Sequence, residues 1–280
     1  EGYKKFNGGI AVQLTFWAKI FHDNNWEVYS LSSRQNKNIE GVNFIKVPKI
    51  KILVFIMYFC YSFKTILKLK PNVIILRGAG RNLFSVAFCA KLFRVKLVFM
   101  GANDINFLPG KERIKGSFVN SYLFRVGIKL TNCFVVQNKF QKEQLNLNYN
   151  KVSIIIPNIW RNDKFLVKEN LPLNSILWVG NFRHQKRPEW FIGLAKSLPD
   201  QNFLMIGFPN DIELFKKIKK LANNVENLKI IDGLPFKKTA SFFTKAKLFI
   251  CTSRHEGFPN TFLQAWSNAV PVISSVDPSD

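Results

Sequence analysis

The sequence predicts an α/β protein with two domains, each built on a parallel sheet. Short apolar runs of strand length alternate with helix-length segments, which is typical of parallel strands connected by helices. The clearest unit consists of the apolar run 248–251, a polar loop, a helical segment and the strand 270–273. With 280 residues, the chain is long enough for two domains of ordinary size.

The first domain is predicted to span residues 1–159. A helical apolar pattern follows Gly8 and Gly9. Strands are expected where apolar runs end in polar loops, and the last of them ends at Pro157 and Asn158. The strands expected in this domain are 26–31, 73–76, 97–100, 134–138 and 152–156.

The polar stretch 160–174 has no periodicity and is the predicted linker to a second domain at 175–280. Strands of that domain are expected at 176–179, 203–206, 227–231, 248–251 and 270–273. The chain begins at Glu1 without a methionine, reaches its first glycine pair almost at once, and stops just after a strand. We therefore expect an opening strand and a C-terminal segment to be missing from it.

The composition is that of a globular protein, with 47% hydrophobic and 21% charged residues. The net charge of +23 is uneven: through Phe165 there are 26 Lys and Arg against 8 Asp and Glu, and the remainder has 15 against 10. The first half is therefore expected to face an anionic membrane surface or a phosphorylated acceptor. A biased genome or a solvated basic face are the alternatives. No nucleic-acid partner is expected, because RNA-binding and zinc-finger patterns are missing from the sequence.

The four cysteines are scattered in apolar contexts and form no C-x-x-C pair. This pattern indicates reduced thiols in a reducing compartment. No secretory signal is visible, and a cytoplasmic location is predicted. The cysteines are Cys60, Cys89, Cys133 and Cys251.

The most hydrophobic stretch is 50–69, with lysines around it that include Lys64 and Lys68. Its uninterrupted apolar part is about a dozen residues long, which is too short to span a bilayer. One interpretation is a core or surface helix. The other is an interfacial helix on anionic lipid, which predicts peripheral association with the inner face of the cell membrane.

A candidate anion site lies in the loop after the strand 248–251. Loops at the carboxyl ends of parallel strands are where open α/β sheets bind ligands. Asn260 is a good N-cap residue, so the helix is predicted to begin at Thr261. Its free N–H groups and positive dipole end would favour an anion, most often a phosphate.

The run from Glu256 to Asn260, with Pro271 and Val272 further on, resembles the Glu-x7-Glu signature of retaining glycosyltransferases of family 4. The resemblance implies the GT-B fold, in which two Rossmann-like domains face each other across a cleft. It implies transfer of a hexose-type sugar, with retention, from a UDP- or GDP-linked nucleotide sugar to a lipid-linked or saccharide acceptor, as in polysaccharide or glycolipid synthesis. The sequence departs from the signature at Gln264, in place of the second glutamate, and at Ala269, in place of a glycine.

The resemblance also implies roles for individual residues. Glu256 would lie beside the transferred sugar and Gln264 at the ribose, whose hydroxyls an amide oxygen can still bind. Lys186 matches the lysine that holds the donor diphosphate, while Asn181 stands in place of an arginine whose charge Arg183 could supply. The remaining donor-binding candidates are Gly8, Gly9, Gly257, Phe258, Pro259, Asn260 and Thr261.

Asp104 is the second catalytic candidate, because in related enzymes the loop 101–104 faces the acceptor. It would orient an acceptor hydroxyl; the alternative is a simple Asx turn made by Asn103 or Asp104. Asp104 and Asn106 only loosely resemble a metal-binding Asp-x-Asp motif, which GT-B enzymes generally do without. We therefore expect no metal and no cofactor other than the donor substrate.

The segment 77–81 contains two glycines of a dinucleotide fingerprint but has Leu83 at the third position. A loop lining the cleft, with Arg77 and Arg81 as cations, is the preferred interpretation. Two other functions stay open at this point: a nucleotide-sugar epimerase of the same fold, and a catalytically silent membrane scaffold, suggested by Gln264 and Asn181.

Overall fold

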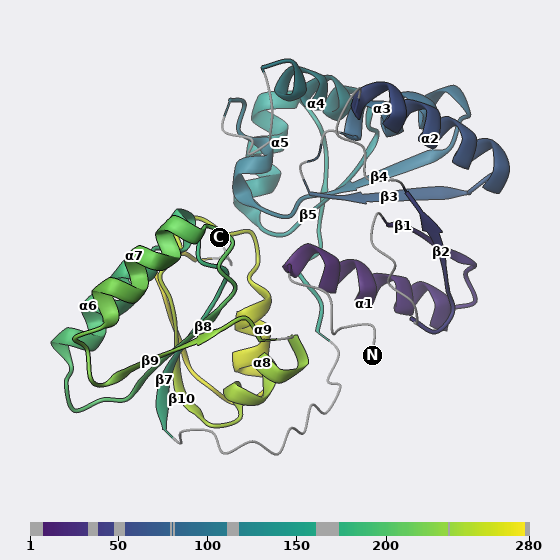
Figure 1. Ribbon diagram of the computed structural model, residues 1–280. Helices are drawn as coiled ribbons and strands as arrows, with labels where there is room; N and C mark the ends of the chain where they lie inside the picture. Colours follow the sequence, from purple (N-terminus) through teal and green to yellow (C-terminus); the bar gives the residue numbers. More distant parts are fainter. Residues whose placement is uncertain are drawn as a thin grey trace. The chain divides into compact units, whose positions relative to one another are not determined.

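The computed structural model describes residues 8–32, 39–47, 54–78, 80, 82–110, 118–160, 174–234 and 236–277 (Figure 1). Most of the predicted linker and Arg81 lie outside the described residues. The chain divides into two compact units. We call Trp17–Asn158 the N-terminal unit, and Ile159–Asp277 together with the beginning of the chain up to Phe16 the C-terminal unit.

The C-terminal unit contains a five-stranded parallel sheet of order β11-β10-β7-β8-β9. From β7 the chain moves outward to β8 and β9, and then returns to the other side of β7 with β10. The carboxyl ends of β7 and β10 are therefore neighbours at the topological switch point, where such sheets bind ligands. The strands are β7 (Ser175–Val179), β8 (Phe203–Gly207), β9 (Leu228–Asp232), β10 (Ala246–Cys251) and β11 (Val272–Ser274).

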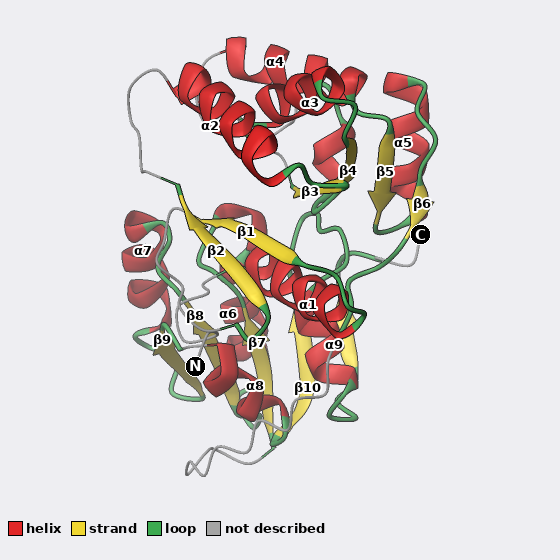
Figure 2. Ribbon diagram, turned by 90° about the vertical axis from the view of Figure 1, so that its right-hand side faces the viewer, coloured by secondary structure: helices red, strands yellow, loops and turns green. Residues whose placement is uncertain are grey.

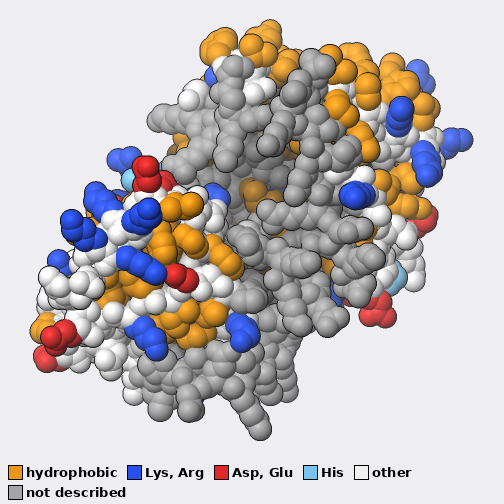
Figure 3. Space-filling model, viewed as in Figure 1, with side chains coloured by type: hydrophobic (Ala, Val, Ile, Leu, Met, Phe, Trp, Pro, Cys, Tyr) orange, Lys and Arg blue, Asp and Glu red, His pale blue; other side chains and the backbone are white. Residues whose placement is uncertain are grey.

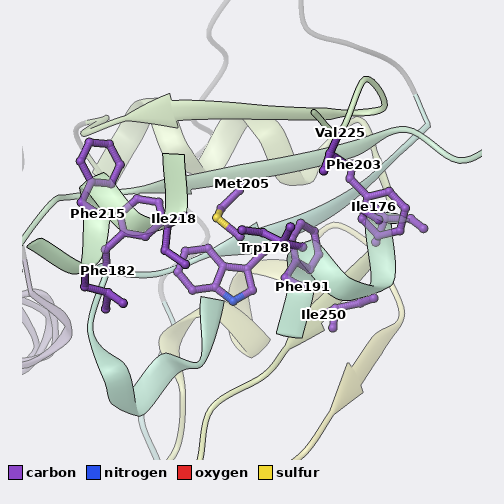
Figure 4. Packing of buried hydrophobic residues seen from close by; sticks show 13 residues of the cluster. Ile176, Trp178, Phe182, Phe191, Phe203, Met205, Phe215, Ile218, Val225 and Ile250 are labelled. Atoms are coloured by element: carbon purple, nitrogen blue, oxygen red, sulfur yellow. The ribbon is translucent and has the colours of Figure 1, made fainter. Parts of the chain in front are cut away.

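Helices cover both faces of this sheet, which explains why its central strands read as continuous apolar runs. One face packs around Trp178 and Met205 against α6 (Pro188–Ser197) and α7 (Ile212–Ala222) (Figure 4). The other face packs against α8 (Phe236–Phe243) and α9 (Asn260–Trp266).

The end of β8 comes very close to the loop after β7. A Cβ atom at Gly207 would lie 1.8 Å from the Gly180 carbonyl oxygen. Only glycine fits at position 207, and this close approach brings the backbone of the candidate donor loop next to the sheet.

Helix α1 (Gly9–Asp23) contributes its first half to the C-terminal unit. Val12 and Phe16 are buried there and pack against Ile159 and Trp160. Gln13 is also buried: its Nε2 donates to the Ile159 carbonyl at 2.7 Å, and its Oε1 accepts from the Ile159 N–H at 3.0 Å.

The N-terminal unit contains a four-stranded parallel sheet of order β3-β4-β5-β6. Its strands are β3 (Val73–Arg77), β4 (Lys96–Met100), β5 (Cys133–Val136) and β6 (Ile154–Ile155). A separate parallel pair is formed by β1 (Val28–Ser32) and β2 (Val42–Lys46), of which β2 was not expected from the sequence. The helices are α2 (Val54–Leu69), α3 (Leu83–Leu92), α4 (Phe118–Leu130), α5 (Lys139–Tyr149) and the short 3-10 helix η2 (Asp104–Phe107).

Helices α2, α3 and α4 lie side by side in one layer over the sheet of the N-terminal unit (Figures 1 and 2). Helices α3 and α4 meet closely at Gly127, where a Cβ atom would lie 2.8 Å from the Leu83 side chain and 2.9 Å from the Phe84 backbone nitrogen. The core beneath them is built around Phe99, Phe107 and Phe124. The predicted α/β class with two parallel-sheet domains is thus confirmed.

Ala269 provides a test of the local backbone at the end of α9. Its φ of 56° is left-handed, and the Val270 N–H donates to the Ala265 carbonyl at 2.9 Å in the manner of a helix C-terminal cap. We expect Ala269→Gly to raise the free energy of unfolding by roughly 0.5–1 kcal/mol, since a Cβ is disfavoured in this region. Urea denaturation measures the change. As a control, Ala222→Gly at the end of α7 should be destabilising; equal effects at both positions would contradict the prediction.

Candidate active site

The loops that follow β7 and β10 are joined through Thr252. Its hydroxyl accepts a hydrogen bond from Trp178 Nε1 at 3.0 Å and donates to the Lys186 carbonyl at 2.6 Å. Thr252 and Trp178 are both buried. A hydroxyl that is satisfied on both sides fixes the two loops relative to each other at the switch point.

Arg187 and Gln185 extend this connection. The Arg187 guanidinium donates to the carbonyls of Thr252 and Ser253, each at 2.8 Å, and lies 3.8 Å above the ring of Trp190. The Gln185 amide donates to the His255 carbonyl at 2.6 Å. Lys186 and these two neighbours are therefore bound to the β10 loop, whereas Arg183 and His184 are exposed.

Lys186 and Glu256 form an ion pair between the two loops, with Nζ and Oε1 2.5 Å apart. The side chains are only 23% and 13% exposed. Burial by itself lowers the pKa of Lys186, but the charge of the Glu256 carboxylate and its hydrogen bond outweigh that effect, so that the pKa of the lysine is raised. The Arg183 guanidinium acts in the opposite direction on the same pKa.

Asn260 does not cap helix α9, contrary to the prediction. The N-cap residue is Pro259, and the helix begins at Asn260 rather than at Thr261. The Asn260 side chain is engaged by α1 instead: its Nδ2 donates to the Gly9 carbonyl at 3.1 Å, and its Oδ1 accepts from Gln13 Nε2 at 3.0 Å. These long-range bonds compete with the local cap and replace it.

The same bonds hold the start of α1, with Gly8 and Gly9, beside the start of α9 within the C-terminal unit. A Cβ atom at Gly9 would lie 2.8 Å from Asn260 Nδ2. The exposed pair Gly8 and Gly9 therefore lies at the start of α1, beside the start of α9. The hydrogen bond between Asn260 and Gly9 thus joins residues that are 251 positions apart in the sequence.

Gln264 is buried on α9 with 2% of its surface exposed. Its Nε2 has no hydrogen-bond partner in the part of the chain that the structure describes. An unsatisfied buried amide is costly and calls for an explanation. Of the other donor candidates, Gly257 and Pro259 are buried, whereas Asn181, Phe258 and Thr261 are half-buried.

In the N-terminal unit, Asp104 is held by two amides. Its carboxylate accepts from Asn138 Nδ2 at 3.0 Å and from Gln141 Nε2 at 3.1 Å. The Asx-type cap also exists, but Asn103 makes it by accepting from the Ile105 N–H at 3.2 Å. The Asx turn is therefore present and is made by Asn103, while the role of Asp104 towards an acceptor stays a prediction.

Arg77 lies at the carboxyl end of β3 and is buried. Its guanidinium donates to Asn158 Oδ1, and the side-chain amide of Gln137 lies 2.7 Å from the same oxygen. Burial lowers the pKa of Arg77 to about 10. Arg77 is the last residue of β3, while Asn158 and Gln137 follow β6 and β5, so the carboxyl edge of this sheet carries a buried polar cluster.

The sequence-based site did not include Gln13, Gln137, Asn158, Thr252 or Arg187. The sequence contained one indication of three of them, because Gln137, Asn158 and Thr252 are polar residues that each follow a strand. Gln13 could also have been noticed, because it is a polar residue on an otherwise apolar helix face.

Among the described residues, no group of three or more His, Cys, Asp and Glu side chains is placed to hold a metal ion. The described helices also include none whose length and hydropathy would let it cross a membrane.

The sequence of the C-terminal unit matches a known family. Residues 159–279 fit the model of the glycosyl transferases group 1 family. That region of the chain is therefore similar to this family. The match contains both loops of the site, from Asn181 to Arg187 and from Thr252 to Gln264.

Two relatives extend the similarity over nearly the whole chain. An uncharacterised glycosyltransferase of Methanocaldococcus jannaschii is 26% identical over 281 residues, which cover 98% of this chain and 76% of the relative. The amylovoran biosynthesis glycosyltransferase of Erwinia amylovora is 22% identical, with coverage of 96% and 77%. The similarity to glycosyltransferases thus extends beyond the region that the family model matches.

Solved structures agree on the GT-B fold. A sucrose-phosphate synthase from Thermosynechococcus elongatus has a TM-score of 0.74 at 14% identity and covers 98% of this chain and 78% of its own. A UDP-GlcNAc 2-epimerase from Neisseria meningitidis, bound to UDP-GlcNAc, has a TM-score of 0.59 at 13% identity, with coverage of 97% and 80%. At these identities the likeness shows the fold alone.

The ion pair makes a testable contribution to stability. We expect Glu256→Gln to lower the free energy of unfolding by roughly 1–3 kcal/mol, because it leaves the largely buried Lys186 cation unpaired. Because the pKa of Lys186 is raised, the contribution of the lysine is present below pH 10.5 and is lost as the pH rises above that value. Urea unfolding of both forms between pH 7 and 11 measures it.

The exposed pair between Lys219 and Asp232, with a separation of 3.0 Å, is the matched control. Asp232→Asn should change the free energy of unfolding by less than about 0.5 kcal/mol, because surface pairs contribute little. Equal costs for the two substitutions would contradict the burial of the Lys186–Glu256 pair.

Gln264 can be tested by introducing the carboxylate that the signature has at this position. We expect Gln264→Glu to be less stable than the parent at neutral pH, because burial raises the pKa of the new carboxyl. A raised carboxyl pKa means that the folded state holds the proton more tightly, so the deficit should shrink as the pH falls towards about 4. Thermal unfolding from pH 4 to 8 measures it. Gln264→Leu, which has no charge, should show no such pH trend; a pH-independent deficit in Gln264→Glu would contradict the burial of this side chain.

Proposed function

We propose that this glycosyltransferase moves a hexose-type sugar, with retention, from a UDP- or GDP-linked nucleotide sugar to a saccharide or lipid-linked acceptor, as in polysaccharide or glycolipid synthesis. The observation that carries the proposal is the Lys186–Glu256 pair at the switch point of the C-terminal sheet. A cation and a carboxylate at that position suit the two ends of a nucleotide-sugar donor. The cation would bind the anionic diphosphate, which is the leaving group, and the carboxylate would bind the hydroxyls of the sugar ring.

The donor diphosphate competes with Glu256 for Lys186. When a phosphate oxygen binds the Lys186 ammonium, the carboxylate is released to accept hydrogen bonds from sugar hydroxyls. As the bond between the sugar carbon and the diphosphate breaks, negative charge grows on the leaving oxygen. A lysine already fixed by its loop stabilises that charge without having to reorganise.

Other residues complete the proposed donor site. Gln264 would bind the ribose, which would give its unsatisfied amide a partner after a small movement of the side chain. Arg183 is exposed and close enough to affect Lys186, and it is the proposed substitute for the arginine that Asn181 replaces. Gly8 and Gly9, held beside Asn260, would allow a phosphate close to the backbone.

Asp104 is the residue proposed to orient the acceptor hydroxyl. It is half-buried, and two amides hold its carboxylate in one position. We propose that the reaction needs no metal, that Lys186 and its neighbours provide the positive charge, and that the protein acts in the cytoplasm.

The proposal is tested with a panel of UDP- and GDP-sugars, by following nucleoside diphosphate release with and without saccharide acceptors. We expect acceptor-dependent release with a subset of donors. Glu256→Ala should abolish transfer, whereas Glu213→Ala, on the exposed face of α7, should retain it. Gln264→Glu should bind the donor as well as the parent protein, or better.

The outcomes separate the alternatives. Formation of an epimeric nucleotide sugar without acceptor would indicate an epimerase, a function found on this fold in the Neisseria enzyme. Absence of nucleotide-sugar binding in calorimetry would leave a non-catalytic scaffold. Full transfer activity in Glu256→Ala would overturn the assignment of the site.

A further inference from the structure

We propose that the outer face of helices α2, α3 and α4 docks the protein onto a bilayer surface that contains anionic lipid headgroups. The inference concerns the N-terminal unit alone and does not depend on the donor chemistry proposed above. It gives a physical basis to the basic character of the first half of the chain, which the candidate active site does not explain.

The three helices form a continuous layer with one side turned to the sheet. Leu83 and Ala87 of α3 and Phe124 of α4 are buried against the strands. Phenylalanines join α2 to α3: the ring of Phe59 lies 5.8 Å from that of Phe88, and Phe63 lies 5.1 Å from Phe93. Because the inner side of this layer is buried in the core, its opposite side faces outward.

Large apolar side chains are exposed on that outward side. They include Phe118, which is 78% exposed, and Phe88, whose ring is also part of the seam between α2 and α3. On α2 the exposed positions recur every three or four residues and so lie on one helix face. The exposed apolar residues of the layer are Ile56, Leu67, Phe88, Leu92, Phe118, Val119 and Tyr122; Figure 3 shows hydrophobic side chains gathered at the edge of the molecule over these helices.

The charges on the same helices are all positive. Helices α2, α3 and α4 contain no Asp or Glu, and their ionised side chains are Lys64, Lys68, Lys91, Arg125 and Lys129. Apolar side chains flanked by lysines and arginines on one helical face are typical of segments that lie in the headgroup region, where the apolar groups reach the acyl boundary and the cations pair with lipid phosphates.

A bilayer fits this surface better than a second copy of the chain. Two copies that met through this face would bring together eight exposed lysines with no acidic residue from these helices to offset them, and like charges at an interface are costly. An anionic lipid surface supplies the missing negative charge over the whole area. Since no described helix is long and apolar enough to cross the membrane, the contact is peripheral.

The experiment is cosedimentation of the full chain with vesicles of phosphatidylcholine alone or mixed with phosphatidylglycerol. We expect binding to the anionic vesicles and little to the neutral ones, with weakening at high salt. The triple variant Lys64→Gln, Lys68→Gln, Lys129→Gln should bind about 100-fold more weakly, since each cation near an anionic surface contributes about fivefold. The double variant Phe118→Ser, Tyr122→Ser should lose about tenfold, through the apolar area that it removes.

Matched controls use residues outside the helical layer. Lys216→Gln, Lys217→Gln, Lys220→Gln removes three exposed lysines of α7, the same change in net charge. Leu147→Ser on α5 changes a side chain that is 76% exposed, close to the value for Phe118. Both controls should bind vesicles within about twofold of the parent, because neither changes a residue of the helical layer that is proposed to contact the lipid.

Three outcomes would overturn the proposal. The first is that the protein does not bind anionic vesicles. The second is that the triple lysine variant of α7 loses as much vesicle affinity as the triple lysine variant of the helical layer. The third is a dimer in solution that Phe118→Ser, Tyr122→Ser dissociates while vesicle binding stays unchanged. Thermal unfolding of every variant confirms that it is folded. Turnover of the nucleotide-sugar donor without vesicles is measured in parallel and should be unchanged by the surface variants. If neither the parent protein nor any variant turned over a donor, this would count against the proposed function, and the vesicle result would still be valid.

Discussion

The site depends on a single constraint: the loops after β7 and β10 must be held together at the switch point of the sheet. The Lys186–Glu256 ion pair meets this constraint with opposite charges, and the Thr252 hydroxyl and the Arg187 guanidinium meet it with hydrogen bonds to the backbone. These hydrogen bonds hold the two loops together independently of the ion pair. Catalytic sites gain from such fixed groups, since their reorganisation is complete before the reaction begins.

The beginning of the chain contributes to the same site from a distance. Gln13 forms hydrogen bonds with both Ile159 and Asn260. These bonds hold the first half of α1 against Ile159 and against the start of α9. Asn260 gives up its local capping role for these bonds. In this exchange the Asn260 amide bonds through both its oxygen and its nitrogen, while the α9 backbone begins after a proline that is already extended.

Both units use the carboxyl edges of their sheets for polar groups. In the C-terminal unit these groups are charged and bind each other across two loops. In the N-terminal unit they are a buried arginine and several amides, with Asp104 fixed by Asn138 and Gln141. The layer formed by α2, α3 and α4 in the N-terminal unit differs from both edges. It exposes apolar and basic side chains, and the three helices contain no acidic residue to pair with the basic ones.

Local sequence pattern was enough to predict the alternation of strands and helices and the polar loop with Glu256 after a strand. It also singled out Ala269, whose backbone is left-handed. The fold was needed to establish the partner of Asn260, the burial of Gln264, the division of α1 between two units, and which side of α2, α3 and α4 faces outward. The physical reason is that caps and periodicity act over a few residues, whereas hydrogen-bond partners and burial depend on groups that only folding brings together.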